Sequence, residues 1–245
     1  MRHKLARAKH HFESFKTEVD RYIQHGTNYG VLDANRNVNS AIMDVQVRHP
    51  IPPDIPLIIG DCVQNLRSAL DYLVWEMVIA TGSQPSKRNA FPICTTDAAF
   101  DVEADKKRLR GISDPELIAK IKALQPCKNG NVPEQDPLFI LDELTNINKH
   151  RRILLASLKG NFVLGRSNLA DLGTHLSVNI SLTVVHDDTE IPAPVAAGQV
   201  QMYHQIIASI AFNEGCAQGK SVLELLDSTA KYIEGIVIAF EALVP

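Results

Sequence analysis

The stretch Leu57 to Thr81, LIIGDCVQNLRSALDYLVWEMVIAT, decides the fold because it carries the clearest helical pattern in the chain. Its apolar and polar residues occupy opposite halves of a helical wheel, which predicts a long helix with one buried face. The apolar half comprises Cys62, Val63, Leu66, Ala69, Leu70, Leu73, Val74 and Met77. The polar half comprises Asp61, Gln64, Asn65, Arg67, Ser68, Asp71, Tyr72 and Glu76.

Further helices are predicted on both sides of this stretch, because apolar residues recur there at spacings of three and four. The prolines between positions 50 and 56 favour extended backbone, so the long helix is expected to begin after them. Asp136 and Pro137 suit the N-cap and first position of a later helix, and Ser221 suits the N-cap of the last one. The additional helices are predicted over residues 3–25, 97–110, 114–124, 137–150 and 221–243.

Two regions have the character of β-structure. A hairpin is predicted near residues 29–49, with its turn at Asn35-Arg36-Asn37, and further strands are predicted between residues 153 and 212. Within the second region, residues 176–185 alternate apolar with polar side chains, as in a strand with one buried face. Strands and helices do not alternate in βαβ order, so the fold class is α+β: a helical bundle with an antiparallel sheet and a C-terminal helix. No linker divides the chain, so residues 1–245 are expected to form one domain.

Composition narrows the classes of protein to consider. A content of 45% hydrophobic residues supports a packed core, and a net charge of −3 gives no general attraction to nucleic acid or to an anionic membrane. The segment after Met1 is charged, and the chain has no stretch of 18 apolar residues, so a cytoplasmic protein without a membrane span is expected. The four cysteines are widely spaced and are read as reduced thiols, and no cofactor or metal is expected.

The first candidate site is the polar face of the long helix. Asp61, Asn65 and Ser68 follow one another at i, i+4 and i+7, and Arg67 and Asp71 form an adjoining i, i+4 pair. Asn and Asp are poor helix formers, so their presence suggests that this face contacts something other than bulk water. It could face a ligand, form a surface ion pair, or belong to a buried network that joins helices.

The second candidate is LDELTNINKHRR, residues 141–152. On a helix Glu143, Asn146 and His150 share one face, and His150 is a candidate acid or base for a phosphate-bearing ligand. Positive charge surrounds it, from Lys149, Arg151 and Arg152. This charge also has a purely structural explanation, because cations stabilise the dipole at a helix C-terminus. Asn148 falls among the apolar positions, so it is expected to be buried and to need partners.

The segments GDCVQNLRSALDYLVW (60–75), FPI (91–93), QP (125–126) and NINKHRR (146–152) together resemble an uncharacterised family of bacterial proteins. The resemblance implies no activity. It does imply that seven residues match the family's motif positions, namely Asp61, Asn65, Arg67, Asp71, Lys149, His150 and Arg151. A more distant, fold-level likeness to the HEPN helical bundles brings no site residues with it, because the Arg and His spacing of their shared helix does not occur here.

Two hypotheses of different classes follow, and the sequence leaves open whether the chain is an enzyme. In the first, helices 57–81 and 137–150 form a cleft that binds a small anionic ligand or RNA, with His150 as the catalytic group. The ligand-binding residues would be Asp61, Asn65, Arg67, Asp71, Glu143, Asn146, Lys149 and Arg151. In the second, the same residues form a structural network in a non-enzymatic interaction module or homodimer. A metal-dependent hydrolase is the weakest reading, because zinc prefers more His or Cys ligands.

Overall fold

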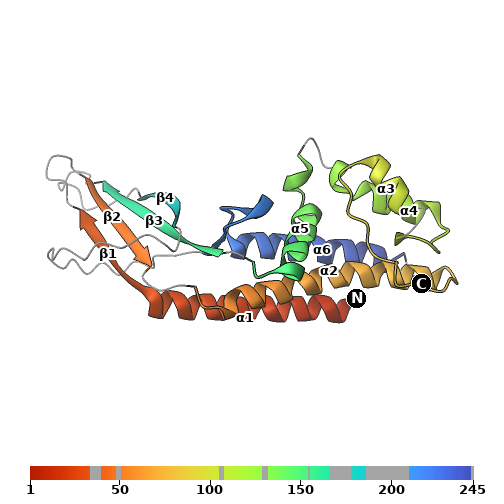
Figure 1. Cartoon of the computed structure of the whole chain (residues 1–245), viewed down its shortest axis with the longest axis horizontal. Coiled ribbons are helices and arrows are strands. Elements are labelled where there is room, and N and C mark those ends of the chain that lie inside the picture. Colours follow the sequence, from red (N-terminus) through yellow and green to blue (C-terminus); the bar gives the residue numbers. More distant parts are fainter. Residues whose placement is uncertain are drawn as a thin grey trace.

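The computed structural model of the chain describes residues 1–33, 40–47, 51–104, 108–128, 132–153, 155–165, 178–185 and 210–243. The predicted helical bundle with a C-terminal helix is confirmed, since this part of the chain holds six α-helices, α1 to α6. Figure 1 shows α1, α2 and α6 side by side in an elongated layer, with α5 crossing it and the strands β1 to β4 at one end. Of the helices described, each is too short or too polar to cross a lipid bilayer.

The layer is built on α2 (Asp54–Ala80), which packs against α1 (Arg2–Gly26) and α6 (Val222–Glu241). Every residue assigned to the apolar half of α2 from the sequence is buried, which confirms the predicted face. The helix predicted over residues 3–25 is also confirmed, to within one residue at each end. The Ser221 side chain accepts a hydrogen bond from the Glu224 N–H, as expected of the N-cap of α6.

The ends of α2 follow from backbone chemistry. The helix begins three residues earlier than predicted, at Asp54, and Pro56 lies inside its first turn. Proline is tolerated there because the first N–H groups of a helix have no intrahelical acceptor. At the other end the Gly82 N–H donates to Ile79 O and the Ser83 N–H donates to Val78 O, which is the Schellman pattern. Gly82 has φ = 76°, a left-handed conformation that favours glycine.

The middle of the chain forms three shorter helices, α3 (Asp97–Glu103), α4 (Pro115–Ala123) and α5 (Pro137–His150). The Asp136 carboxylate accepts from the Leu138 N–H at 2.8 Å, so the predicted cap of α5 is confirmed. The predicted single helix over 97–110 is wrong in length. The α-helix ends at Glu103 and residues 109 and 110 are not helical, and the side-chain amide of Asn89 donates to the carbonyls of Arg108 and Arg110. Short 3-10 turns lie at Pro126–Lys128, Pro133–Gln135 and Gly215–Ala217.

The strands are β1 (Thr27–Asp33), β2 (Ser40–Val47), β3 (Leu155–Gly165), β4 (Val178–Val185) and β5 (Ile210–Phe212). Their backbones pair antiparallel in the order β1-β2-β3-β4, and β5 pairs with the beginning of β3. In β1 to β4 the side-chain burial is described for Leu155 alone, so the predicted burial of one sheet face stays a prediction. The predicted turn at residues 35–37 and the predicted strand residues 200–209 also lie outside the described residues.

Candidate functional site

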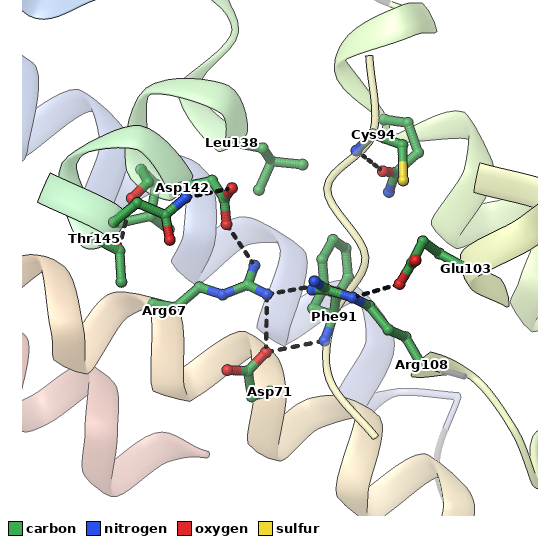
Figure 2. Close-up of polar contacts among 12 residues, drawn as sticks. Arg67, Asp71, Phe91, Cys94, Glu103, Arg108, Leu138, Asp142 and Thr145 are labelled. Atoms are coloured by element: carbon green, nitrogen blue, oxygen red, sulfur yellow. Dashed lines mark hydrogen bonds and ion pairs between the residues drawn. The ribbon is translucent and has the colours of Figure 1, made fainter. Parts of the chain in front are cut away.

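Arg67 is a buried cation at the centre of the first candidate site. The residue is only 5% exposed, although the helical wheel places it in the polar half of α2. Its Nη2 donates to the Phe91 carbonyl oxygen at 2.7 Å and lies 3.3 Å from Asp71 Oδ1 (Figure 2). Its Nη1 lies 3.9 Å from Asp142 Oδ1 on α5 and makes no hydrogen bond among the described residues. The guanidinium is therefore enclosed by the protein itself.

Arg67 and Asp71 hold both polar groups of one peptide residue. Arg67 donates to the carbonyl of Phe91, and Asp71 Oδ1 accepts from the Phe91 N–H at 2.9 Å. The Phe91 residue is fully buried. This segment between α2 and α3 has no helix or strand of its own, so its backbone groups must find partners elsewhere. The i, i+4 pair on α2 supplies those partners.

The same segment is held again three residues later. The side-chain carbonyl of Gln125, which is fully buried, accepts from the Cys94 N–H at 2.9 Å. Its amide nitrogen donates to Ile121 O at 3.0 Å, so Gln125 fixes the end of α4 to the segment that follows Phe91. The FPI and QP motifs of the sequence are thus two ends of one hydrogen-bonded arrangement, to which the Arg67–Asp71 pair belongs.

Asp142 extends this arrangement to α5. It lies opposite Arg67, and its Oδ2 accepts from the Asn146 side-chain amide at 3.2 Å. Asn146 is itself exposed. The helices 57–81 and 137–150 therefore do pack together, as the ligand-binding hypothesis requires. Their contact at this point is filled by side chains that bind one another.

Asp61 and Asn65 lie on the side of α2 that faces α1. The Asn65 side-chain amide donates to the Asp61 main-chain carbonyl at 2.8 Å, and its oxygen lies 3.4 Å from the Lys4 ammonium. Asp61 is exposed, with its side chain outside the Arg67 arrangement. The nearby His11 has a pKa lowered by burial, with the charge of Asp61 acting in the opposite direction.

Glu143 joins α5 to the turn before α6. Its Oε2 accepts from the Cys216 N–H at 3.0 Å. A Cβ placed on the preceding residue, Gly215, would come within 2.7 Å of Glu143 Oε1, and Gly215 has φ = 62°. Burial first, and then the hydrogen bond to Glu143, raise the pKa of the Cys216 thiol to about 12, so it is protonated at neutral pH. The carboxylate thus has a structural partner rather than a position facing a ligand.

Asn148 packs against Gly60 on α2. A Cβ on Gly60 would come within 2.7 Å of Asn148 Cγ, so the two helices can approach here only because position 60 lacks a side chain. Asn148 is half-buried rather than fully buried. The glycine of the GD motif is therefore explained by helix packing, as is the asparagine among the apolar positions of α5.

The cationic end of α5 lies apart from Arg67. His150 and Lys149 are exposed, as are Arg151 and Arg152 beyond the helix end. Arg151 forms an ion pair with the buried carboxylate of Glu214. His150 follows Asp142 by eight residues, about 12 Å along the helix axis at ~1.5 Å per residue. Figure 2 shows Asp142 beside Arg67.

The structure thus brings together Arg67, Asp71, Asn146 and Asp142, and it places Asp61, Glu143 and the 149–151 group in three other environments. Sequence reasoning missed the three partners that complete these contacts, Phe91, Glu214 and the Gly215 turn. Only Phe91 had a signal in the sequence, since it belongs to the FPI motif at residues 91–93. The sequence assigned Cys62 to the core, and burial raises the pKa of its thiol to about 12. No metal-ligating cluster of three His, Cys, Asp or Glu residues occurs in the described ranges.

Comparison of the chain with models of protein families, with curated proteins and with solved structures found no match. The family resemblance of the motifs therefore stays a prediction.

The Arg67 contacts predict a large loss of stability when the guanidinium is removed. We expect Arg67→Met to lower the free energy of unfolding by about 2–4 kcal/mol, because it leaves the buried Phe91 carbonyl with only the longer 3.4 Å hydrogen bond from Arg108 and leaves the Asp71 charge without its partner. The measurement is urea denaturation followed by circular dichroism.

Two variants serve as controls for this experiment. Arg88→Met makes the same change at an exposed residue of the same loop, and His150→Ala changes an exposed residue, so both should shift stability by no more than ~0.5 kcal/mol. An Arg67→Met protein as stable as the Arg88→Met protein would contradict the structural role of Arg67.

Proposed function

We propose that the chain is a non-enzymatic interaction module that self-associates through an exposed apolar stripe on α2. In this proposal the polar residues of α2 and α5 form a structural network that holds the two helices together. The observation that carries it is the enclosure of Arg67, whose guanidinium is directed at Phe91, Asp71 and Asp142. A cation held in this way has little exposed surface to offer a ligand.

The interaction surface is a stripe of three large residues at i, i+3 and i+7 of the same helix. Tyr72, Trp75 and Ile79 are 49%, 43% and 55% exposed, and their spacing places them on one side of α2. Trp and Tyr are enriched among the residues that dominate the energy of protein interfaces. We name this surface the Trp75 stripe.

Charged groups border the Trp75 stripe on the α1 side. The Lys4 ammonium lies 5.7 Å from the centre of the Tyr72 ring, and the amino group of Met1 lies 3.8 Å from the Glu76 carboxylate. An apolar centre with a polar border is the usual anatomy of an interface. Because both signs of charge occur on this border, two copies related by a twofold axis can place Lys4 of one beside Glu76 of the other.

The proposal predicts a dimer that depends on Trp75. We expect sedimentation velocity to detect a species of twice 27.0 kDa, and we expect Trp75→Ser to raise the dimer dissociation constant by about thirtyfold, the effect of losing ~2 kcal/mol at a hot spot. The matched control is Val102→Ser, which removes an exposed apolar side chain from α3 and should leave the dimer unchanged. A wild-type chain that stays monomeric at all concentrations would refute the proposal.

A second candidate function is binding of an anionic ligand, including RNA, by the end of α5. The observation that favours it is the exposure of Lys149, Arg151 and Arg152 around the exposed His150. The centre of this site differs from the cleft expected from the sequence, because Arg67 lies elsewhere. Since Arg151 is already paired with Glu214, the exposed charge comes mainly from Lys149 and Arg152.

This second candidate predicts salt-dependent binding of a short single-stranded RNA, measured by fluorescence anisotropy. Lys149→Gln and Arg152→Gln should each weaken binding and reduce the slope of log K against log salt by about 0.7, the value for one lost single-strand contact. Lys87→Gln, in an exposed loop, is the control. Absence of binding by the wild-type chain would remove this candidate and leave the proposed dimer untouched.

A further inference from the structure

A groove with an apolar lining runs between α4 and α6. It has a volume of about 660 Å³. Figure 1 shows α4 and the C-terminal part of α6 at the end of the molecule where the C-terminus lies. The lining comes from the end of α4, with Lys120 and Leu124, and from the second half of α6, with Gly235, Ile236, Ala239 and Phe240. The volume falls in the range of about 300–1,000 Å³ that is typical of small-molecule sites.

Gly235 keeps the groove open. A Cβ at this position would meet nothing within 4 Å, so no packing contact explains the glycine in the middle of α6. Glycine in a helix interior is unfavourable relative to alanine, and no positive φ requires it here. One turn later Ala239 is exposed and also small. The two residues leave apolar space beside Ile236 and Phe240.

The charges of the lining are all of one sign. Among the described residues that line the groove, the charged ones are Lys120 and Lys231. The Lys231 ammonium pairs with Asp227 at 2.6 Å, whereas Lys120 is exposed and forms no salt bridge within the described part of the chain. A ligand whose negative charge meets Lys120 and whose carbon chain lies along α6 would match both properties.

We propose that the α4–α6 groove is a binding site for a single-chain amphiphile with an anionic head group, such as a fatty-acid carboxylate. The acyl chain covers the apolar floor at Gly235, Ala239 and Phe240, and the carboxylate pairs with Lys120. A neutral or cationic head group lacks that pairing. The site does not rest on the proposed dimer, because the Trp75 stripe lies on α2.

The test is isothermal titration calorimetry of the full chain with decanoate below its critical micelle concentration, compared with decyltrimethylammonium. Saturable one-to-one binding of decanoate is expected, with weaker binding of the cationic analogue. Gly235→Leu should weaken decanoate binding by about tenfold or more, the loss expected when about two methylene groups no longer reach apolar surface. The change also favours the helix, so the variant is expected to fold.

Two controls separate this site from general adsorption. Ser228→Leu adds the same side chain at an exposed position of α6 outside the groove lining and should bind decanoate as the wild type does. Lys120→Gln should remove the preference for decanoate over the cationic analogue, whereas Lys87→Gln should keep it. No saturable binding by the wild type, equal binding of both amphiphiles, or equal binding by the Gly235→Leu and Ser228→Leu proteins would overturn the proposal.

Discussion

The rest of this structure depends on the hydrogen bonds that the Arg67–Asp71 pair makes to the peptide groups of Phe91. One charged donor and one charged acceptor, four residues apart on α2, satisfy the N–H and the C=O of a buried residue that belongs to no helix or strand. Buried main-chain groups without partners are costly, so this pair decides where the segment between α2 and α3 can lie. The position of Phe91 then sets where Cys94 meets Gln125, and hence where α4 attaches.

The position of α5 also depends on Arg67. Arg67 has one side toward Phe91 and the other toward Asp142, so a single guanidinium contributes to holding both the loop and the crossing helix against α2. The close approach of Asn148 to Gly60 and the contacts of Glu143 with the Gly215 turn fix α5 at two further points. These polar contacts join elements rather than open a space between them. Because these polar residues are already bound to one another, we propose that the function lies on the exposed surfaces.

Much of the helical framework could be predicted from sequence because its signals are local. The buried face of α2 follows from periodicity, and the starts of α5 and α6 follow from capping residues whose hydrogen bonds reach only two or three positions. The length of α3 could not be predicted in this way. Beyond its end, the carbonyls at 108 and 110 accept from Asn89, a contact with a segment distant in sequence that helical spacing does not reveal.

The candidate site residues show the same difference between local signals, which the sequence reveals, and contacts between distant segments, which it does not reveal. Periodicity correctly paired Arg67 with Asp71, but it placed them on a polar face without information about what covers that face. The burial of Arg67 depends on a loop residue, Phe91, that lies 24 residues away in the chain. Arg151 pairs with Glu214, and Glu143 lies beside Gly215. Both of these partners lie still further along the chain, in a segment that carries no recognisable motif. Spacing along one helix cannot supply contacts of this kind, because only the packed structure brings these segments together.

Amide hydrogen exchange of Phe91 and Cys94, followed by NMR, measures how firmly the segment between α2 and α3 is held by its side-chain partners. Both amides lie outside regular secondary structure, yet each donates to a side-chain oxygen that the structure holds in place. The account predicts that these two amides exchange as slowly as those in the middle of α2, and that Arg67→Met removes much of the protection at Phe91. Exchange of Phe91 as fast as that of the exposed loop residue Lys87 would contradict the account.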